Sequence, residues 1–208
     1  MFALLVTPLA NSGGRNLAAL GTLGAMYLRG EGVPTNAVKA AKFFRRAAKQ
    51  GDVKARKVLA AMFYRGEGVP KDIEEAVQWF SQAAEQGDLE SQRALAMLYS
   101  TGQEVRKSPE EAIKWLTKAG EQGDLASQKI LGGMYLSGEG ITRDTGEAFK
   151  WFARAANQGD LKSQILLAGA YYRGMGVPMD KTEAAQWYRK AASQGHAEAQ
   201  TVLGLMVA

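Results

Sequence analysis

The chain of 208 residues contains no cysteine and only one histidine. Without cysteine it can form neither a disulfide framework nor a thiolate metal site or thiol nucleophile. The single imidazole, His196, excludes sites that need two histidines from one chain, such as paired-histidine zinc motifs. Ser-x-x-Lys, Gly-x-Gly-x-x-Gly and Walker motifs are also missing. The sequence therefore predicts no catalytic residue, no metal and no cofactor.

Long hydrophobic runs are missing too. Residues 1–10 are apolar but are too few to span a bilayer, so no transmembrane segment is predicted. They suit the apolar core of an export signal, with Pro8-Leu9-Ala10 as its exit, although a basic segment before them is lacking. A signal remnant would indicate a periplasmic or secreted protein. The alternative is a cap on the first helix of a cytoplasmic protein, and both interpretations stay open.

The dipeptide Gln-Gly recurs every 36 residues. It stands at positions 50–51, 86–87, 122–123, 158–159 and 194–195. A fixed period of this size is typical of solenoids, in which each unit buries its apolar face against its neighbours. We expect a single repeat domain over residues 16–208, after an N-terminal extension at 1–15. The expected units are 16–51, 52–87, 88–123, 124–159 and 160–195, followed by a half-unit at 196–208.

The first half of each unit has apolar residues three and four apart, as in Leu59, Met62 and Phe63, which predicts an amphipathic helix A. An aspartate after each Gln-Gly can cap the start of this helix. His196 takes the place of that aspartate in the last unit, so we interpret it as a helix-start residue. Helix A is expected to end at a glycine that can adopt the left-handed conformation. These glycines are Gly30, Gly66, Gly102, Gly138 and Gly174.

A second helix B follows a tight loop in each unit. Its start is indicated by a polar residue with an acid three positions later, as in Asp72 with Glu75, which is the pattern of a capping box or a close variant. The loop reads Gly-x-Gly-Val-Pro in three units; residues 103–106 and Thr142 depart from it, so those two loops are expected to differ in shape. Each complete unit is thus predicted to be an antiparallel helical hairpin.

Alanine and aromatic residues recur at fixed places on helix B. Alanine occupies 40, 76, 112, 148 and 184, and again 47, 83, 119, 155 and 191. Between them stand Phe43, Trp79, Trp115, Trp151 and Trp187. Small residues let helices approach closely, and a large aromatic ring can bury on the order of 200 Å². We interpret both sets as core.

The segment Leu59-Ala-Ala-Met-Phe-Tyr-Arg-Gly-Glu-Gly-Val-Pro resembles Sel1-like repeats, a family related to tetratricopeptide repeats. The capping pair, Trp79-Phe80, Ala83-Ala84 and Gln86-Gly87 extend this resemblance, which covers about residues 16–208. It implies an all-α fold: a right-handed α-solenoid of about five antiparallel hairpins plus a terminal half-repeat, with helix A on the concave side. It also implies an adaptor that binds proteins. The chain lacks the cysteines of those relatives that are associated with penicillin binding.

The positions that vary between units while facing the same way lie on helix A. They carry lysine, arginine and tyrosine in several units, and such side chains are frequent anchors in protein interfaces. We therefore predict a peptide or partner-protein site on the concave helix A surface; a solvated face is the alternative. The predicted site residues are Arg29, Lys57, Tyr64, Arg65, Arg93, Lys129, Tyr172 and Arg173.

Charge is distributed unevenly along the chain. Residues 1–66 hold 11 Lys or Arg against 2 acids, for a net charge of +9, whereas residues 67–208 hold 15 against 19, for −4. The basic end could steer an acidic partner. Nucleic acid is a weaker interpretation because no interleaved aromatic platform accompanies the charge. A solvated basic face is the remaining alternative.

The last half-unit, residues 196–208, begins a helix A that has no helix B after it. Its apolar side could cap the array or form a subunit contact. The predicted function is accordingly a non-catalytic protein-interaction adaptor. A structural assembly role through self-association is the alternative, and a hydrolase or penicillin-binding enzyme is the least favoured hypothesis.

Overall fold

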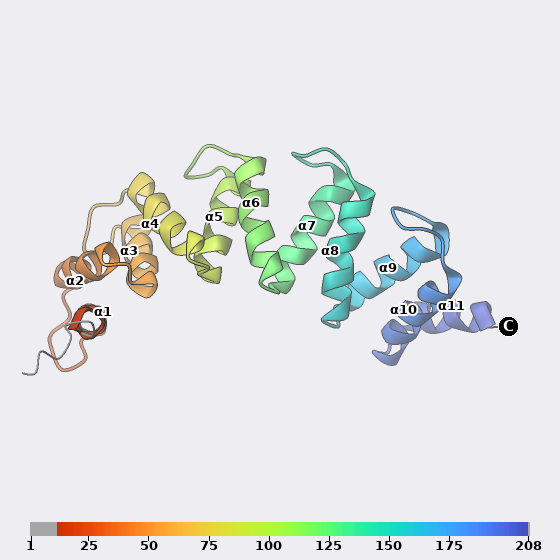
Figure 1. Ribbon diagram of the computed structural model, residues 1–208, viewed down its shortest axis with the longest axis horizontal. Coiled ribbons are helices and arrows are strands. Elements are labelled where there is room, and N and C mark those ends of the chain that lie inside the picture. The colour runs from red at the N-terminus through yellow and green to blue at the C-terminus, as the bar shows by residue number, and fades with distance from the viewer. Residues whose placement is uncertain (1–11, 208) are drawn as a thin grey trace, which may run out of the picture. The chain divides into compact units, whose positions relative to one another are not determined.

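The computed structural model describes residues 12–207, and over this range the chain forms eleven α-helices and no strand (Figure 1). Residues 1–10, with their expected signal or cap, lie outside the described part. The helices are α1 (Ser12–Arg29), α2 (Ala37–Lys49), α3 (Val53–Arg65), α4 (Ile73–Glu85), α5 (Leu89–Thr101), α6 (Pro109–Glu121), α7 (Leu125–Ser137), α8 (Thr145–Asn157), α9 (Leu161–Arg173), α10 (Lys181–Ser193) and α11 (Ala197–Val207). The all-α class is therefore confirmed.

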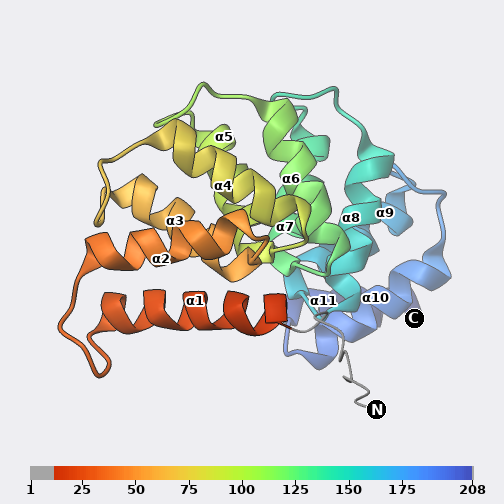
Figure 2. The ribbon, with the colours of Figure 1, turned by 60° about the vertical axis from the view of Figure 1, so that its left-hand side comes forward.

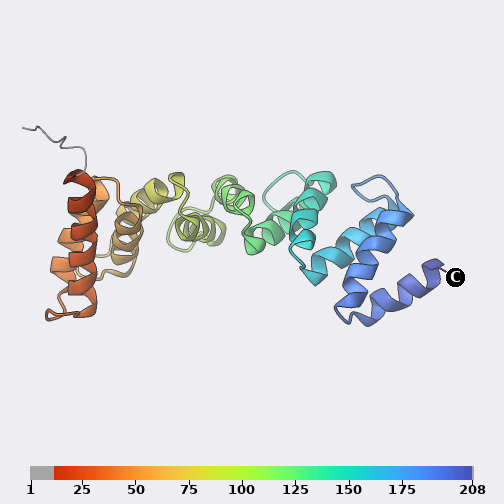
Figure 3. The same ribbon diagram turned by 60° about the horizontal axis from the view of Figure 1, so that its bottom comes forward.

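Two kinds of helix alternate along the chain and pair into hairpins. Odd-numbered helices are helix A of a repeat and even-numbered helices are helix B. Within repeats α1 packs on α2, as Figure 2 shows, and α3 packs on α4. Between repeats α2 packs on α3, α8 on α9 and α10 on α11. Figure 3 shows α9, α10 and α11 in succession at the C-terminal end of the described chain. At these junctions one hairpin thus covers the next, as the 36-residue period predicts.

The aspartate after each Gln-Gly begins helix A, as predicted. Asp52 Oδ1 accepts from the Ala55 amide at 3.1 Å, and Asp160 Oδ2 accepts from the Ser163 amide at 2.9 Å. His196 has the same role through Nδ1, which accepts from the Ala199 amide at 3.1 Å. The interpretation of His196 as a helix-start residue is confirmed.

Helix B begins with only half of a reciprocal capping box. Asp72 Oδ1 accepts from the Glu75 amide at 2.9 Å, as expected for the cap. The Asp72 amide, however, donates to the Phe63 carbonyl on helix A at 3.0 Å. The Glu75 carboxylate instead accepts from Trp79 Nε1 at 3.0 Å. Helix A therefore takes over the amide that a reciprocal box would satisfy.

The loop between the helices depends on two glycines with positive φ. Gly66, the predicted end of α3, has φ 72°, and Gly68 has φ 69°. A Cβ at Gly68 would lie 2.3 Å from the Ala37 carbonyl of the preceding helix B, so only glycine permits this approach. In the third loop Glu104 replaces the second glycine, and among the described residues no non-glycine has positive φ. That loop differs in conformation, as expected.

The predicted small and aromatic core positions of helix B are buried. Ala76 and Ala83 are fully buried, and so are their counterparts in the other repeats. The four tryptophans are 2–8% exposed, while Phe43, their counterpart in the first repeat, is half-buried. In the fourth and fifth repeats Phe149 and Phe152 join Leu167 and Trp187 in one apolar cluster. The core is therefore continuous from the fourth hairpin to the fifth.

The chain divides into two compact units, of which one ends at Leu95 and the other begins at Ala96. The division falls within α5, in the same repeat as the loop that carries Glu104. The expectation of a single domain over 16–208 stays a prediction.

Candidate functional site

A hollow between successive A helices recurs in the described part of the chain. It lies between α1 and α3 with a volume of about 510 Å³, between α7 and α9 with about 280 Å³, and between α9 and α11 with about 670 Å³. The first belongs to the unit that ends at Leu95 and the other two to the unit that begins at Ala96. The junctions between helices A are therefore the concave features from which a site can be built.

The three hollows use the same positions of the 36-residue repeat. The floor is a ring on helix B, one wall comes from the end of the first helix A, and the other comes from the next helix A. The floor residues are Phe44, Phe152 and Tyr188. The first-wall residues are Leu28, Leu136 and Tyr172, and the second-wall residues are Val58, Leu166 and Val202. One scaffold thus presents three variants of a single pocket.

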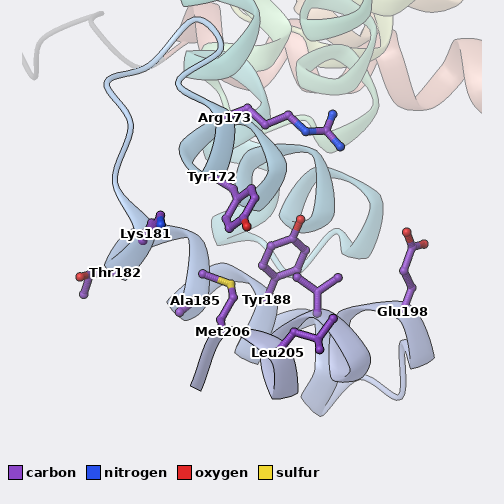
Figure 4. Close-up of a pocket in the computed structure, with 10 residues that line it drawn as sticks. Tyr172, Arg173, Lys181, Thr182, Ala185, Tyr188, Glu198, Leu205 and Met206 are labelled. Atoms are coloured by element: carbon purple, nitrogen blue, oxygen red, sulfur yellow. The ribbon is translucent and has the colours of Figure 1, made fainter. Parts of the chain in front are cut away.

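The α9–α11 hollow combines an apolar interior with charged edges (Figure 4). The rings of Tyr172 and Tyr188 and the side chain of Leu205 line it, and Leu205 remains 76% exposed. In Figure 4, Arg173 and Lys181 lie on different sides of the hollow from Glu198. Neither Arg173 nor Lys181 forms an ion pair with a described residue, so both cations are accessible to a ligand.

Tyr188 brings a hydroxyl to the floor where other repeats have phenylalanine or leucine. Burial raises the pKa of this phenol, Arg173 opposes the shift, and Glu198 and Tyr172 add to it. The hydroxyl therefore keeps its proton through the neutral range and can both donate and accept a hydrogen bond.

Lys57 and Lys129, two of the predicted site residues, form ion pairs with acidic residues of the next repeat. Lys57 Nζ lies 2.6 Å from Glu90 Oε2 and 3.5 Å from Asp88 Oδ1 on the next helix A. The hydrogen bond to Glu90 is the largest of the effects that raise the pKa of Lys57. Lys129 Nζ lies 2.6 Å from Asp160 Oδ1 across the α7–α9 junction. Both lysines thus join neighbouring repeats.

The other six predicted residues lie on helix A but do not form one cluster. Tyr172 and Arg173 share the α9–α11 hollow, and Arg29 lines the α1–α3 hollow, where it also pairs with Glu31 at 3.5 Å. Tyr64 is half-buried, with Lys71 Nζ 5.8 Å from its ring centroid. Arg65 and Arg93 are exposed. Their role in binding stays a prediction.

The sequence-based prediction did not include the helix B floor and the α11 wall of the α9–α11 hollow. Tyr188 and Leu205 were not among the predicted residues. A signal for both was available: Tyr188 carries the only hydroxyl at its repeat position, and Leu205 stands where two other repeats have glycine, Gly133 and Gly169. The predicted site residues all lie on helix A, whereas side chains of three helices, α9, α10 and α11, line the hollow.

Part of the basic charge near the N-terminal end is also used internally. Arg45 lies 3.8 Å from Glu75 and over the Phe63 ring at 5.1 Å. Arg56 Nε donates to the Ala48 carbonyl at 3.0 Å. The attraction of an acidic partner to this end stays a prediction.

The fold and its grooves define a helical repeat scaffold. The Sel1 repeat profile matches residues 17–52, 54–88, 89–124, 125–160 and 161–196. The chain therefore belongs to the Sel1 repeat family. Proteins of this family are generally protein-interaction modules, and the fold is typically a non-catalytic scaffold.

Two solved structures support this assignment. The chain is 36% identical to c5321, a protective antigen of uropathogenic Escherichia coli strains, with a TM-score of 0.68 over 91% of this chain and 41% of that one. It is 34% identical to a Sel1 repeat protein from Oxalobacter formigenes, with a TM-score of 0.61 over 96% of this chain and 78% of that one. The chain thus spans less than half the length of c5321. No curated protein sequence matches it significantly.

Within residues 12–207 no group of three or more His, Cys, Asp or Glu side chains is placed to hold a metal ion. In the same range no helix is long and apolar enough to cross a membrane.

Proposed function

We propose that this protein is a non-catalytic adaptor that binds an extended segment of a partner protein on its helix A surface, with the α9–α11 hollow as the principal anchor. The single observation that carries the proposal is that Tyr172, Tyr188 and Leu205 surround an open hollow of about 670 Å³. Aromatic and arginine side chains around such a pocket are typical of interface anchors. The hollow lies on a Sel1 repeat scaffold, and proteins of this family are generally protein-interaction modules.

The chemistry of the hollow indicates what it would select. Its interior suits a large apolar side chain, and the Arg173 guanidinium can form a bidentate pair of hydrogen bonds with a carboxylate. We expect a partner segment with a leucine, methionine or aromatic residue and an acidic residue close by. The remaining predicted residues, Arg29, Tyr64, Arg65 and Arg93, lie in the unit that ends at Leu95 and would form a separate contact with a partner there.

A displayed library of random linear peptides, selected on the full chain, tests the proposal. We expect enrichment of sequences that pair an apolar anchor with an acid. The double variant Tyr172→Ala/Arg173→Ala should bind a selected peptide at least tenfold more weakly. Tyr64→Ala/Arg65→Ala changes the same two repeat positions on α3, which none of the described hollows uses, and should have a smaller effect. Selected peptides that bind both variants like the unmodified chain would contradict this placement of the site.

Self-association is the second candidate function, because Leu205 on α11 is 76% exposed. In that case a second copy would cover the α11 face. Light scattering over a range of concentrations, with Leu205→Glu as the comparison, separates the two functions. A mass that stays monomeric at all concentrations would exclude assembly through α11.

A further inference from the structure

The α1–α3 junction lacks a side chain that other junctions use. Gly21 stands at the repeat position that holds Lys57 on α3 and Lys129 on α7. Those two lysines bind acidic residues on the next helix A, at 2.6 Å from Glu90 and 2.6 Å from Asp160. At Gly21 no side chain enters the junction.

The α7–α9 junction shows what belongs in this place. Lys129 Nζ binds Asp160 Oδ1, while Asp160 Oδ2 accepts from the Ser163 amide at 2.9 Å and from its hydroxyl at 2.7 Å. One carboxylate oxygen therefore caps helix α9 and the other holds an ammonium group. The remaining hollow has a volume of about 280 Å³.

Asp52 caps the start of α3 but binds no ammonium group of a described residue. Its Oδ1 caps the Ala55 amide at 3.1 Å. Its Oδ2 faces Gly21, since a Cβ built there would lie 3.2 Å from that oxygen. Ala55 replaces the serine hydroxyl that serves Asp160. No described residue donates to Asp52 Oδ2, so this carboxylate lacks both the hydroxyl and the ammonium of its counterpart.

The space next to Asp52 suits an aliphatic chain with a charged end. The α1–α3 hollow, of about 510 Å³, is lined beside Gly21 by Ala25, Phe44 and Val58. Lysine buries its methylene groups along such apolar surfaces while its ammonium group stays with a polar partner. A charge-assisted hydrogen bond to a carboxylate is about twice as strong as a neutral one.

Lys54 also lines this hollow, and its positive charge opposes a cation. The α7–α9 junction has the same neighbour, because Lys162 lines that hollow at the repeat position of Lys54. Lys129 nevertheless sits 2.6 Å from Asp160 there. The α7–α9 junction thus shows that this contact tolerates one nearby like charge.

We propose that the α1–α3 hollow is a binding site for a lysine side chain of a partner protein, whose ammonium group binds Asp52 Oδ2 in the place that Lys129 takes at Asp160. The partner lysine makes the ammonium–carboxylate contact that a lysine at position 21 would otherwise make with Asp52. This site is separate from the α9–α11 hollow and does not depend on the proposed role of that hollow.

The test uses two probes and the full chain. Nα-acetyl-lysine methylamide carries the ammonium group, and Nα-acetyl-norleucine methylamide has a similar aliphatic side chain without it. Each is titrated while the backbone amide signals of Gly21 and Ala55 are followed by NMR. We expect the lysine probe to shift both signals saturably, and the norleucine probe to bind at least tenfold more weakly.

Two variants locate the effect. Asp52→Asn keeps a good helix cap but loses the charge, and should weaken the lysine probe at least tenfold. Gly21→Lys supplies the missing side chain from within and should abolish probe binding; its Cβ needs a shift of a few tenths of an ångström in the Asp52 carboxylate. Asp160→Asn, the same change where Lys129 already binds, should leave probe affinity unchanged. Equal binding of the two probes, or unchanged lysine binding by Asp52→Asn or Gly21→Lys, would overturn the proposal.

Discussion

The side-chain amide of Gln158 donates a 2.8 Å hydrogen bond to Oε1 of Gln128, which lies 30 residues earlier. The same amide donates to the Gly123 carbonyl at 3.0 Å, and so joins two Gln-Gly corners that are one repeat apart. Gln128 is itself buried and donates to the Gly120 carbonyl at 2.8 Å. Gln194 and Gln164 repeat the arrangement. The corner glutamine is therefore an inter-repeat contact.

We predict that Gln158→Ala lowers the free energy of unfolding by about 1–2 kcal/mol, because it removes two hydrogen bonds and leaves Gln128 Oε1 without its donor. Gln86→Ala is the matched control. The side chain of Gln86 bonds to no described residue, since Arg56 stands where a glutamine would accept, and arginine has no acceptor. Urea denaturation of both variants gives the comparison. Equal losses would show that the corner contact contributes nothing.

Two adjacent glycines on α7 should respond oppositely to alanine. A Cβ at Gly132 would lie 2.7 Å from the Phe152 ring, whereas a Cβ at Gly133 meets nothing within 4 Å. We expect Gly132→Ala to destabilise the protein by about 1–3 kcal/mol through overpacking. Gly133→Ala should stabilise it by about 0.5–1 kcal/mol through helix propensity. Thermal unfolding followed by circular dichroism measures both, and changes of the same sign would contradict the close packing of α7 on α8.

The Lys129–Asp160 pair makes stability depend on pH in the acid range. Burial alone would raise the pKa of Asp160, but hydrogen bonds from Lys129 and Ser163 outweigh it and hold the pKa below its usual 3.8. Ionised Asp160 therefore stabilises the fold above pH 3.8, and this contribution is lost as pH falls through the lower folded-state value.

We predict that Lys129→Met raises the pKa of Asp160 and shifts this loss to higher pH. An NMR titration of the Asp160 carboxyl carbon checks the direction, and Asp160→Asn, which keeps the cap, should remove this part of the acid dependence. An unchanged Asp160 titration in Lys129→Met would show that the ion pair has no effect.

The tryptophans should also differ in what their N–H groups contribute. Trp79 Nε1 donates to Glu75 at 3.0 Å, but Trp115 Nε1 is buried and finds no acceptor among the described residues. Its counterpart acid, Glu111, instead pairs with Lys114 at 3.3 Å.

We expect Trp79→Phe to cost about 1–2 kcal/mol more stability than Trp115→Phe, because the second change removes an unpaired polar group. Chemical denaturation of the two variants tests this difference. A larger loss for Trp115→Phe would indicate that its N–H is paired after all.

Much of the fold could be predicted because the same local signals recur in register. Asp52 begins α3, Gly66 ends it, and Trp79 fills the core, all as the 36-residue frame predicts. These are short-range effects of capping, positive φ and burial. Because the same residue types recur at equivalent positions every 36 residues, the prediction for one repeat supports the prediction for the next.

The candidate site was harder to predict, because it depends on pairs of residues from different repeats. The lysines at 57 and 129 look like free surface anchors in the sequence but are held by acids on the next helix A. Tyr188 joins Tyr172 only once α9, α10 and α11 are packed. Even the Gln-Gly corner, which the sequence suggests is a mere turn, binds its neighbour through Gln158.

The contact between Lys129 and Asp160 has an evolutionary consequence. The atoms that hold α7 to α9 lie in a hollow that is equivalent, by repeat position, to the one that stands open beside Gly21. A single codon change at such a position exchanges internal cohesion for an accessible carboxylate. At this repeat position one side chain therefore decides whether the capping carboxylate of the next repeat is held internally, as by Lys57 and Lys129, or left open, as beside Gly21.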